Sequence, residues 1–327
     1  MTTTTRTSQP RFQVPAEQPG IKLTDDDYQI LWHIYRNRLI ESSSLYQLFP
    51  GRSAQVISRR LKLLFRTEHI ARPINQNVKN RLRPGTDPYV YAIARNGAAA
   101  LRKKFAAQIP TSGWTYKNAQ LSLTAIEHQL DTSRFVTNLI VAAQSRPDVR
   151  LLYADQLIPA DVAEKRPAGL FNTVRADVSW PTPGRNEGTA PDIILGIEQE
   201  GRRQVLFVEI DRGTETIEPG KRKQRSERFW RDTSFLRKLL IYGAVFRTKA
   251  HQTQLGLPTF RVVTVVPNAD RVESIKAAWH NHLSTGVNRT RPGLFLFTDW
   301  TSMSVAEDLL QVPFQNAAGR PVHLLDE

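Results

Sequence analysis

The chain has 327 residues, 40% of them hydrophobic, which is enough for two domains with buried cores and argues against wholesale disorder. Its formal net charge is +14, from 45 Lys and Arg against 31 Asp and Glu, and this excess favours a polyanionic partner such as nucleic acid. There is no cysteine, which excludes disulfides, thiolate metal sites and cysteine nucleophiles and is compatible with a reducing cytoplasm.

The first segment, residues 1–20, is rich in Thr, Pro and Gln and lacks hydrophobic periodicity, so we expect a disordered polar arm. It has no apolar core of the kind that a signal peptide carries. No apolar run in the chain approaches the roughly 20 residues that a membrane span needs. We therefore expect a cytoplasmic protein that makes no membrane contact.

Residues 21–109 predict a small domain of helices and one β-hairpin. Thr24 and Asp27 stand at capping-box spacing, which indicates the start of a first helix. Two further helices, two short strands around a basic loop and a last helix follow in this order: 41–49, 53–66, 70–73, 89–93 and 96–105. Three helices, a hairpin and a helix form the order of a winged helix-turn-helix.

Most of the positive charge lies in this predicted domain. Between residues 50 and 110 there are 13 Lys and Arg but only two acids, Glu68 and Asp87, which gives a net charge of +11. A solvated helix face usually mixes both signs. We therefore expect the domain to bind double-stranded DNA, although winged helices also serve as protein-interaction modules.

The helix at 53–66 is the one that a helix-turn-helix would place in the major groove. We expect its polar face to contact DNA through the following residues: Arg52, Ser53, Gln55, Arg59 and Lys62. Gln55 and Arg59 are the best candidates for base reading, because both can make bidentate contacts with purine edges. The basic residues of the hairpin loop are expected to touch phosphate or the minor groove: Lys79, Arg81 and Arg83.

A linker is expected at about 110–117, and residues 118–315 predict an α/β domain with a central mixed sheet, since strands alternate with helices. Its expected elements are a helix at 121–143, strands at about 149–153, 173–180, 191–198 and 203–211, a basic helix at about 222–246, a strand at 261–266, a helix at about 270–282, a strand at 294–297 and a frayed tail. The basic helix interleaves cations with aromatic residues. That pattern would suit a DNA-backbone track, but for the aromatic residues a place in the core is the better interpretation.

Two of these strands predict a β-hairpin with Glu200-Gly201 as its turn. With that turn, residues whose numbers sum to 401 lie opposite each other, so Asp192 faces Glu209 with Cβ atoms about 5 Å apart. Asp211 follows two residues after Glu209 and is expected on the same face of the strand. The hairpin therefore gathers three carboxylates.

Like charges directly opposite each other destabilise a sheet, so these carboxylates need a compensating cation. Either Lys or Arg supplies it structurally, or Mg²⁺ (or Mn²⁺) supplies it functionally, since hard oxygen ligands suit these ions. We expect Asp192, Glu209 and Asp211 to hold such a metal. It would activate water and stabilise charge on a scissile phosphate.

The pattern Pro191-Asp192 followed by Glu209-Ile-Asp211 resembles the PD-(D/E)xK nuclease superfamily, which implies a restriction-endonuclease-like fold and metal-dependent cleavage of DNA. In that superfamily two acids bind metal and the last residue is usually a lysine. Asp211 stands at the lysine position here, so the chain departs from the pattern.

The resemblance leaves two alternatives open: some restriction endonucleases of the superfamily tolerate an acidic residue at this position, and in others the lysine lies on a neighbouring helix. Lys238 is the candidate, because Lys238-Leu-Leu-Ile-Tyr242 is similar to the QxxxY helix motif of some members; Lys221 and Lys223 are alternatives. Glu127, on the helix before the sheet, would be a further acidic ligand.

A winged helix followed by an α/β core with Glu209-Ile-Asp-Arg-Gly-Thr-Glu215 resembles the replication-relaxation family of plasmid and mobile-element proteins over most of residues 20–300. The resemblance implies a role in replication, mobilisation or DNA relaxation. Two functions stay open: a DNA-binding protein with a magnesium-dependent endonuclease activity, and a catalytically inactive DNA-binding accessory factor or transcriptional regulator. A homodimer would suit a palindromic DNA site, but the sequence does not require one.

Overall fold

The computed structural model describes residues 14, 20–76, 87–105, 117–118, 120–166, 172–180, 185–226, 228–304 and 308–326. The chain forms two compact units, and the boundary between Thr137 and Asn138 falls inside helix α7 (Leu123–Gln144). Our expected linker at 110–117 lies outside the described residues except at Lys117, and so does nearly all of the expected arm. The domain limits 21–109 and 118–315 therefore stay predictions.

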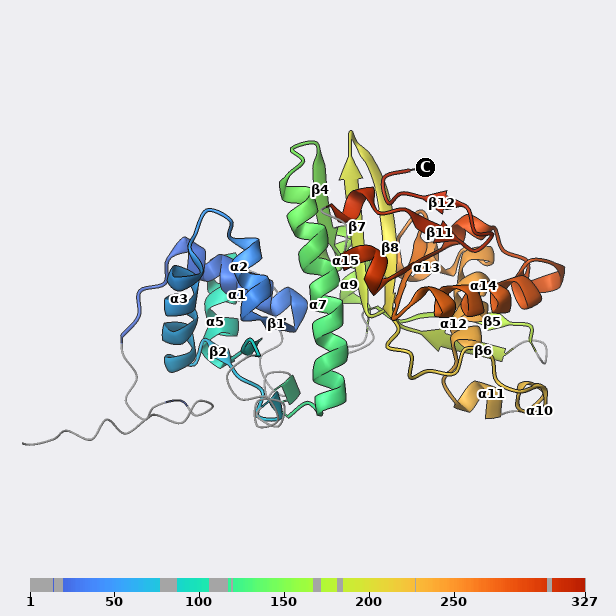
Figure 1. Ribbon diagram of the computed structural model, residues 1–327, viewed down its shortest axis with the longest axis horizontal. Coiled ribbons are helices and arrows are strands. Elements are labelled where there is room, and N and C mark those ends of the chain that lie inside the picture. The colour runs from blue at the N-terminus through green and yellow to red at the C-terminus, as the bar shows by residue number, and fades with distance from the viewer. Residues whose placement is uncertain are drawn as a thin grey trace, which may run out of the picture. The chain divides into compact units, whose positions relative to one another are not determined.

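The first unit contains the expected order of helices and strands (Figure 1). Before α7, the elements whose bounds the structure describes are α1 (Asp25–Asn37), β1 (Leu39–Glu41), α2 (Ser42–Leu48), α3 (Ala54–Arg66), β2 (Ile70–Ala71), β3 (Val90–Ile93) and α5 (Arg95–Phe105). The strands form an antiparallel sheet in the order β1-β3-β2. Strand β1 was not expected, because its three residues are all buried and give no alternating pattern.

Helices α1 and α3 begin where the sequence predicts. Thr24 caps α1 in a capping box with Asp27, and the Ser53 side chain accepts a hydrogen bond from the backbone N–H of Val56 at the start of α3. Helix α3 buries Ile57, Leu61 and other apolar residues on one face. Its opposite face, over the first three turns, is exposed, which leaves polar side chains available at the surface.

The second unit is built around a seven-stranded mixed sheet in the order β12-β11-β10-β9-β8-β7-β4, which confirms the predicted α/β class. The strands are β4 (Val149–Tyr153), β7 (Ile193–Gln199), β8 (Arg202–Ile210), β9 (Arg261–Val266), β10 (Phe295–Asp299), β11 (Phe314–Asn316) and β12 (Pro321–Val322). Strands β8, β9 and β10 run parallel, and the other pairs are antiparallel. The parallel strands are largely buried, as their continuous apolar runs require.

Helices and a smaller sheet accompany the large sheet. The main helices are α8 (Ala154–Leu157), α9 (Ala160–Glu164), α10 (Lys221–Gln224), α11 (Arg228–Arg231), α12 (Phe235–Arg247), α13 (Ala250–Leu255), α14 (Ala269–Leu283) and α15 (Trp300–Ser304). Strands β5 (Val174–Val178) and β6 (Arg185–Thr189) form a separate two-stranded sheet against α12. The core includes Phe207, which stacks on Phe260 with ring centroids 4.3 Å apart. No helix in the described part of the chain is long and apolar enough to cross a membrane.

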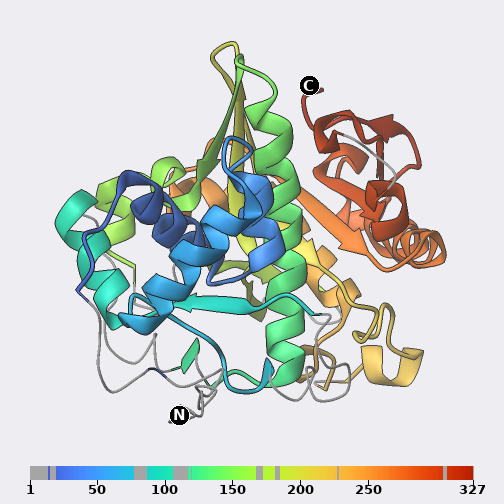
Figure 2. The same cartoon turned by 60° about the vertical axis from the view of Figure 1, so that its left-hand side comes forward.

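The β7–β8 hairpin has the predicted register. Ile193 pairs with Val208 and Glu198 with Arg203, and both sums are 401. Glu200 and Gly201 both have positive φ, at 51° and 78°, as a type I′ turn requires. In both views the turn lies at the upper end of the hairpin, close to the start of β4, and the opposite end lies lower in the unit (Figures 1 and 2). That opposite end carries Asp192 and Glu209.

Two expectations for the second unit are wrong. The single basic helix at 222–246 is three helices, α10, α11 and α12, because the buried Ser234 caps a new helix by accepting a hydrogen bond from Arg237 N–H. The tail does not fray throughout: β11 pairs with β10, and β12 follows after a turn at Gly319, where φ is 79°. The tail strands have only three and two residues, too few for a periodic signal.

Candidate functional site

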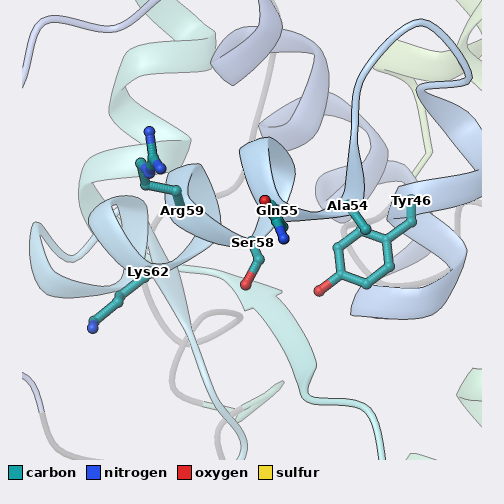
Figure 3. Close-up of a pocket in the computed structure, with 6 residues that line it drawn as sticks. All are labelled: Tyr46, Ala54, Gln55, Ser58, Arg59 and Lys62. Carbon is teal, nitrogen blue, oxygen red and sulfur yellow. The ribbon is translucent and has the colours of Figure 1, made fainter.

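The exposed face of α3 is the first candidate site. It borders a groove of about 470 Å³, and Figure 3 shows the lining residues: Tyr46, Ala54, Gln55, Ser58, Arg59 and Lys62. Gln55 and Ser58 lie nearer to Tyr46, while the Arg59 and Lys62 side chains leave the helix in different directions. Three of the five residues predicted around this helix, Gln55, Arg59 and Lys62, therefore share one surface.

The other two predicted residues have structural partners. Arg52 Nε donates to Asp26 Oδ2 at 2.7 Å, and this hydrogen bond raises the Arg52 pKa. Ser53 uses its hydroxyl oxygen to cap α3, although it remains exposed. The wing residues Lys79, Arg81 and Arg83 lie outside the described residues, so their role stays a prediction.

Neighbouring arginines on α3 have opposite environments. Arg60 Nε donates to Oδ1 of the fully buried Asp27 at 2.7 Å, and a second guanidinium nitrogen donates to Oδ2. The hydrogen bond to Asp27 raises the Arg60 pKa and ties α3 to α1. Arg59 and Lys62 are exposed and make no ion pair within the described residues. Their charges are thus available to a ligand, whereas that of Arg60 is not.

The carboxylate site of the second unit centres on Glu209, near the end of β8. Its Oε2 accepts from Lys238 Nζ at 3.0 Å, and its Oε1 accepts from the Tyr242 hydroxyl. Lys238 and Tyr242 lie one turn apart on α12, so both reach the same carboxylate. Lys238 Nζ is also 3.0 Å from Oε2 of Glu215, in the loop after β8. One ammonium group therefore joins two carboxylates.

Asp192 immediately precedes β7. Its backbone N–H donates to the Val208 carbonyl, and its Oδ2 accepts from Ile210 N–H at 2.7 Å. Continued by one residue, the hairpin register places Asp192 opposite Glu209, and the two carboxylates interact electrostatically. The observed register is thus the one from which the pairing of these two acids was predicted, and their role stays a prediction.

Burial has the largest single effect on the pKa values of Glu209, Lys238 and Tyr242. It raises the pKa of Glu209 to about 7; the nearby Lys238 ammonium opposes the shift, and Asp192 reinforces it. Burial acts to lower the Lys238 pKa, but the Glu209 and Glu215 carboxylates outweigh it and the net shift is upward. Burial also raises the pKa of Tyr242, so its hydroxyl stays a proton donor. Lys238 therefore stays protonated over the pH range in which the neighbouring Glu209 carboxyl gains or loses its proton.

The structure does not bring every predicted residue into this cluster. Asp211 Oδ2 accepts from Arg271 Nε and its Oδ1 from Gly213 N–H, so both oxygens have structural partners. Arg271 also donates to the Glu215 carbonyl at 2.6 Å, which fixes the loop that carries Glu215. Lys223 pairs with Asp232 instead. Glu127 lies in the other compact unit.

The remaining acids can be compared with what a divalent cation needs. Over the described residues no group of three His, Asp or Glu side chains is arranged to hold a metal. Mg²⁺, however, is commonly held by one or two carboxylates together with waters and substrate phosphates. Asp192 and Glu209 provide such a pair of hard oxygen donors, and Glu215 Oε1 is buried without a hydrogen-bond partner. The donor set suits Mg²⁺ or Mn²⁺.

Sequence reasoning missed several residues of both sites. Glu215 was noted only as part of a motif, and its ion pair with Lys238 depends on how the loop after β8 folds back to α12. Tyr242 was noted only as a motif position. Arg271, on α14, is 60 residues from the acid that it binds, and Tyr46 gave no signal. These are long-range contacts, which local spacing does not encode.

Together the two units define a mixed α/β protein with an exposed basic helix face and a buried carboxylate–lysine cluster. The sequence profile of one family, described as replication-relaxation, matches residues 31–256, from α1 to the end of α13. The chain belongs to the replication-relaxation family, which associates it with the replication or relaxation of plasmids and mobile elements. No curated protein and no solved structure matches the chain.

Proposed function

We propose that the protein binds double-stranded DNA through a winged helix-turn-helix in its first unit, with α3 as the recognition helix. The observation that carries the proposal is the row of exposed polar and basic side chains on α3, centred on Gln55, Arg59 and Lys62. A recognition helix reads base edges with its N-terminal residues, and this row begins in the first turn. Gln55 and Arg59 would read purines, and Lys62 would contact phosphate.

Two further observations support this assignment. Every acid in the first turn of α1 is matched with a basic partner, Asp25 with Lys104, Asp26 with Arg52 and Asp27 with Arg60, so these carboxylates are partly neutralised. In addition, Val56 is apolar and 41% exposed beside Gln55. An exposed apolar side chain on a recognition helix can contact a thymine methyl group.

Adjacent arginines provide the test. Arg59→Ala should weaken binding to the preferred duplex about tenfold or more, while leaving thermal stability unchanged, because Arg59 is exposed. Arg60→Ala should lower stability but leave the affinity of the folded chain within about twofold. Fluorescence anisotropy with a labelled duplex at fixed salt measures both. Equal affinities for wild type and Arg59→Ala would contradict α3 as the reading surface.

We further propose that the second unit is a PD-(D/E)xK-like domain with magnesium-dependent endonuclease activity. The supporting observation is that Lys238, from the helix next to the sheet, supplies the ammonium group that the sequence lacks at Asp211. Asp192 and Glu209 would hold the ion. When bound, Mg²⁺ would supply charge neutralisation on the phosphate and a more acidic water.

The protein's own groups have defined parts in this proposal. Tyr242 donates to Glu209 Oε1 and holds that carboxylate in place, and Ile210 N–H does the same for Asp192. The Lys238 ammonium, 3.0 Å from Oε2 of Glu209 and of Glu215, would contact the phosphate or orient water. Arg271 would keep the Glu215 loop in position through Asp211 and the Glu215 carbonyl.

Cleavage of supercoiled plasmid in Mg²⁺ or Mn²⁺ tests the second proposal. Asp192→Asn and Glu209→Gln should abolish nicking, while Asp131→Asn, in the first unit, should not. Nicking that persists in both site variants would show that this cluster is not the site of cleavage. If the wild-type chain cleaves no substrate but binds DNA, the protein is instead an inactive DNA-binding accessory factor or regulator.

A further inference from the structure

A second basic surface lies in the loop and helix that follow the carboxylate site. Helix α10 and its flanks border a hollow of about 820 Å³, lined by Gly220, Lys221, Arg222, Lys223, Ser226 and Asp232. Lys221, Arg222 and the nearby Arg225 are exposed. The α3 and endonuclease proposals do not use this surface, which lies at the start of the segment whose pattern suggested a DNA-backbone track.

Two acids that the structure describes around this surface, Asp232 and Glu218, are already paired. Asp232 lies 2.7 Å from Lys223 Nζ, and Glu218 Oε1 lies 2.7 Å from His282 Nε2 and accepts from Gln224 at 3.0 Å. Lys221, Arg222 and Arg225 make no ion pair with any residue that the structure describes. A solvated helix face would mix opposite charges along its length, whereas the described part of this surface presents three cations without an ion pair.

The basic surface is held firmly to the fold. Phe235 and Leu236, at the start of α12, donate backbone hydrogen bonds of 2.9 Å to the carbonyls of Thr216 and Ile217. The buried Gln224 side chain donates to the Pro219 carbonyl at 2.6 Å. Phe229 and Trp230 of α11 belong to the hydrophobic core of the unit. The cations thus extend from an anchored segment, which limits the entropy lost on binding a ligand.

The surface lies near the carboxylate site. Lys221 follows Glu215 by six residues, which span at most about 20 Å. Both views place α10 and α11 away from the hairpin turn, toward the end of the hairpin that carries Asp192 and Glu209 (Figures 1 and 2). A polyanion that reached the carboxylates could therefore also contact α10.

We propose that Lys221, Arg222 and Arg225 bind the phosphate backbone of duplex DNA, as a second contact distinct from α3. The inference rests on the proposed DNA-binding function and extends it to the second unit. The contact involves charge and no base reading, so it binds all sequences alike. Its charge would hold a duplex against the second unit.

The test compares the salt dependence of duplex binding by the full-length chain. Each phosphate contact contributes about 0.9 to the slope of log affinity against log salt concentration. Lys221→Ala/Arg222→Ala/Arg225→Ala should therefore lower the slope by about 2 to 3 and weaken binding about tenfold or more at low salt, equally for preferred and random duplexes. The charge-preserving variant Lys221→Arg/Arg222→Lys/Arg225→Lys should bind like wild type. Arg320→Ala, an exposed cation elsewhere in the unit, is the control.

The outcomes separate this inference from the α3 proposal. An unchanged slope and affinity in the triple alanine variant, with weaker binding by Arg59→Ala, would overturn the second contact and leave α3 standing. A lowered slope in the triple variant, with no effect of Arg59→Ala, would support the second contact and overturn α3. A triple variant that loses affinity only for the preferred duplex would overturn a backbone contact.

Discussion

The Lys238 ammonium lies 3.0 Å from Oε2 of Glu209, although the two residues are 29 positions apart in the chain. Glu209 is 2% exposed, so its ionised form depends on this one cation and on the Tyr242 hydroxyl. A buried charge without a partner is far less stable than a paired one. The ion pair is therefore both a structural requirement of the second unit and the centre of its proposed chemistry.

Removal of the cation should destabilise the second unit. At pH 8, where Glu209 is largely ionised, we expect Lys238→Met to lower the free energy of unfolding by about 2 to 4 kcal/mol, because a buried carboxylate is left unpaired. Hydrogen exchange of the β7 and β8 amides measures the change. Lys249→Met, at an exposed lysine, should change stability by less than about 0.5 kcal/mol. Equal effects of the two substitutions would contradict the pairing.

The raised pKa of Glu209 gives a pH dependence with a definite sign. Its pKa is about 7 in the folded chain against an ordinary value of 4.5, so the folded state holds the proton more tightly. The free energy of unfolding should therefore fall as pH rises from 4.5 to 7 and receive no further contribution above that range. In wild type this decrease in the free energy of unfolding should be about 3 kcal/mol, and in Glu209→Gln it should be absent. Hydrogen exchange of the β8 amides measures both profiles. Identical profiles for the variant and wild type would refute the assignment.

Two neighbouring aspartates in α1 should differ in their importance. Asp27 is fully buried against Arg60, whereas Asp26 pairs with Arg52 at the surface. Asp27→Asn should cost the first unit about 2 to 3 kcal/mol, and Asp26→Asn less than about 1 kcal/mol. Exchange rates of the α1 and α3 amides measure both. A loss as large in Asp26→Asn would show that burial is not what makes the Asp27 pair important.

Two glycines in the first unit provide a steric comparison. A Cβ at Gly97 would lie 2.1 Å from the His69 carbonyl oxygen, whereas one at Gly51 would meet no atom within 4 Å. Gly97→Ala should destabilise the unit by about 3 kcal/mol or more, because the backbone at His69 must shift. Gly51→Ala should be neutral or slightly stabilising in thermal melting. Similar melting temperatures for the two variants would contradict the close approach of α5 and β2.

Local sequence signals predicted much of the fold. The capping box at Thr24, the alternating and β-branched runs, and the Glu200-Gly201 turn each involve residues close in sequence, and the register of the hairpin follows from its turn. The break between α10 and α12 was missed because it depends on a buried serine cap. Strand β1 and the tail strands are too short to show a period.

The candidate sites could be predicted only in part, for the same reason. Asp192 and Glu209 belong to two segments that are joined by a two-residue turn. Counting residues outward from that turn therefore predicts that they lie opposite each other. Lys238 was inferred from a family resemblance, and the structure places it beside Glu209. Arg271, which binds Asp211, and Glu215, which binds Lys238, are set by the packing of α14 and the loop after β8. No pattern within either segment reveals these partners.

Selection of binding sites from a random duplex library most directly tests the claim that α3 reads DNA. The wild-type chain should enrich a defined sequence, and Gln55→Ala and Arg59→Ala should each relax preference at different base pairs, with about 1 to 3 kcal/mol lost per contact. Lys62→Ala should weaken all sequences about equally. A library that shows no enrichment with the wild-type chain, or the same motif with the same affinity in Gln55→Ala and Arg59→Ala, would contradict this account.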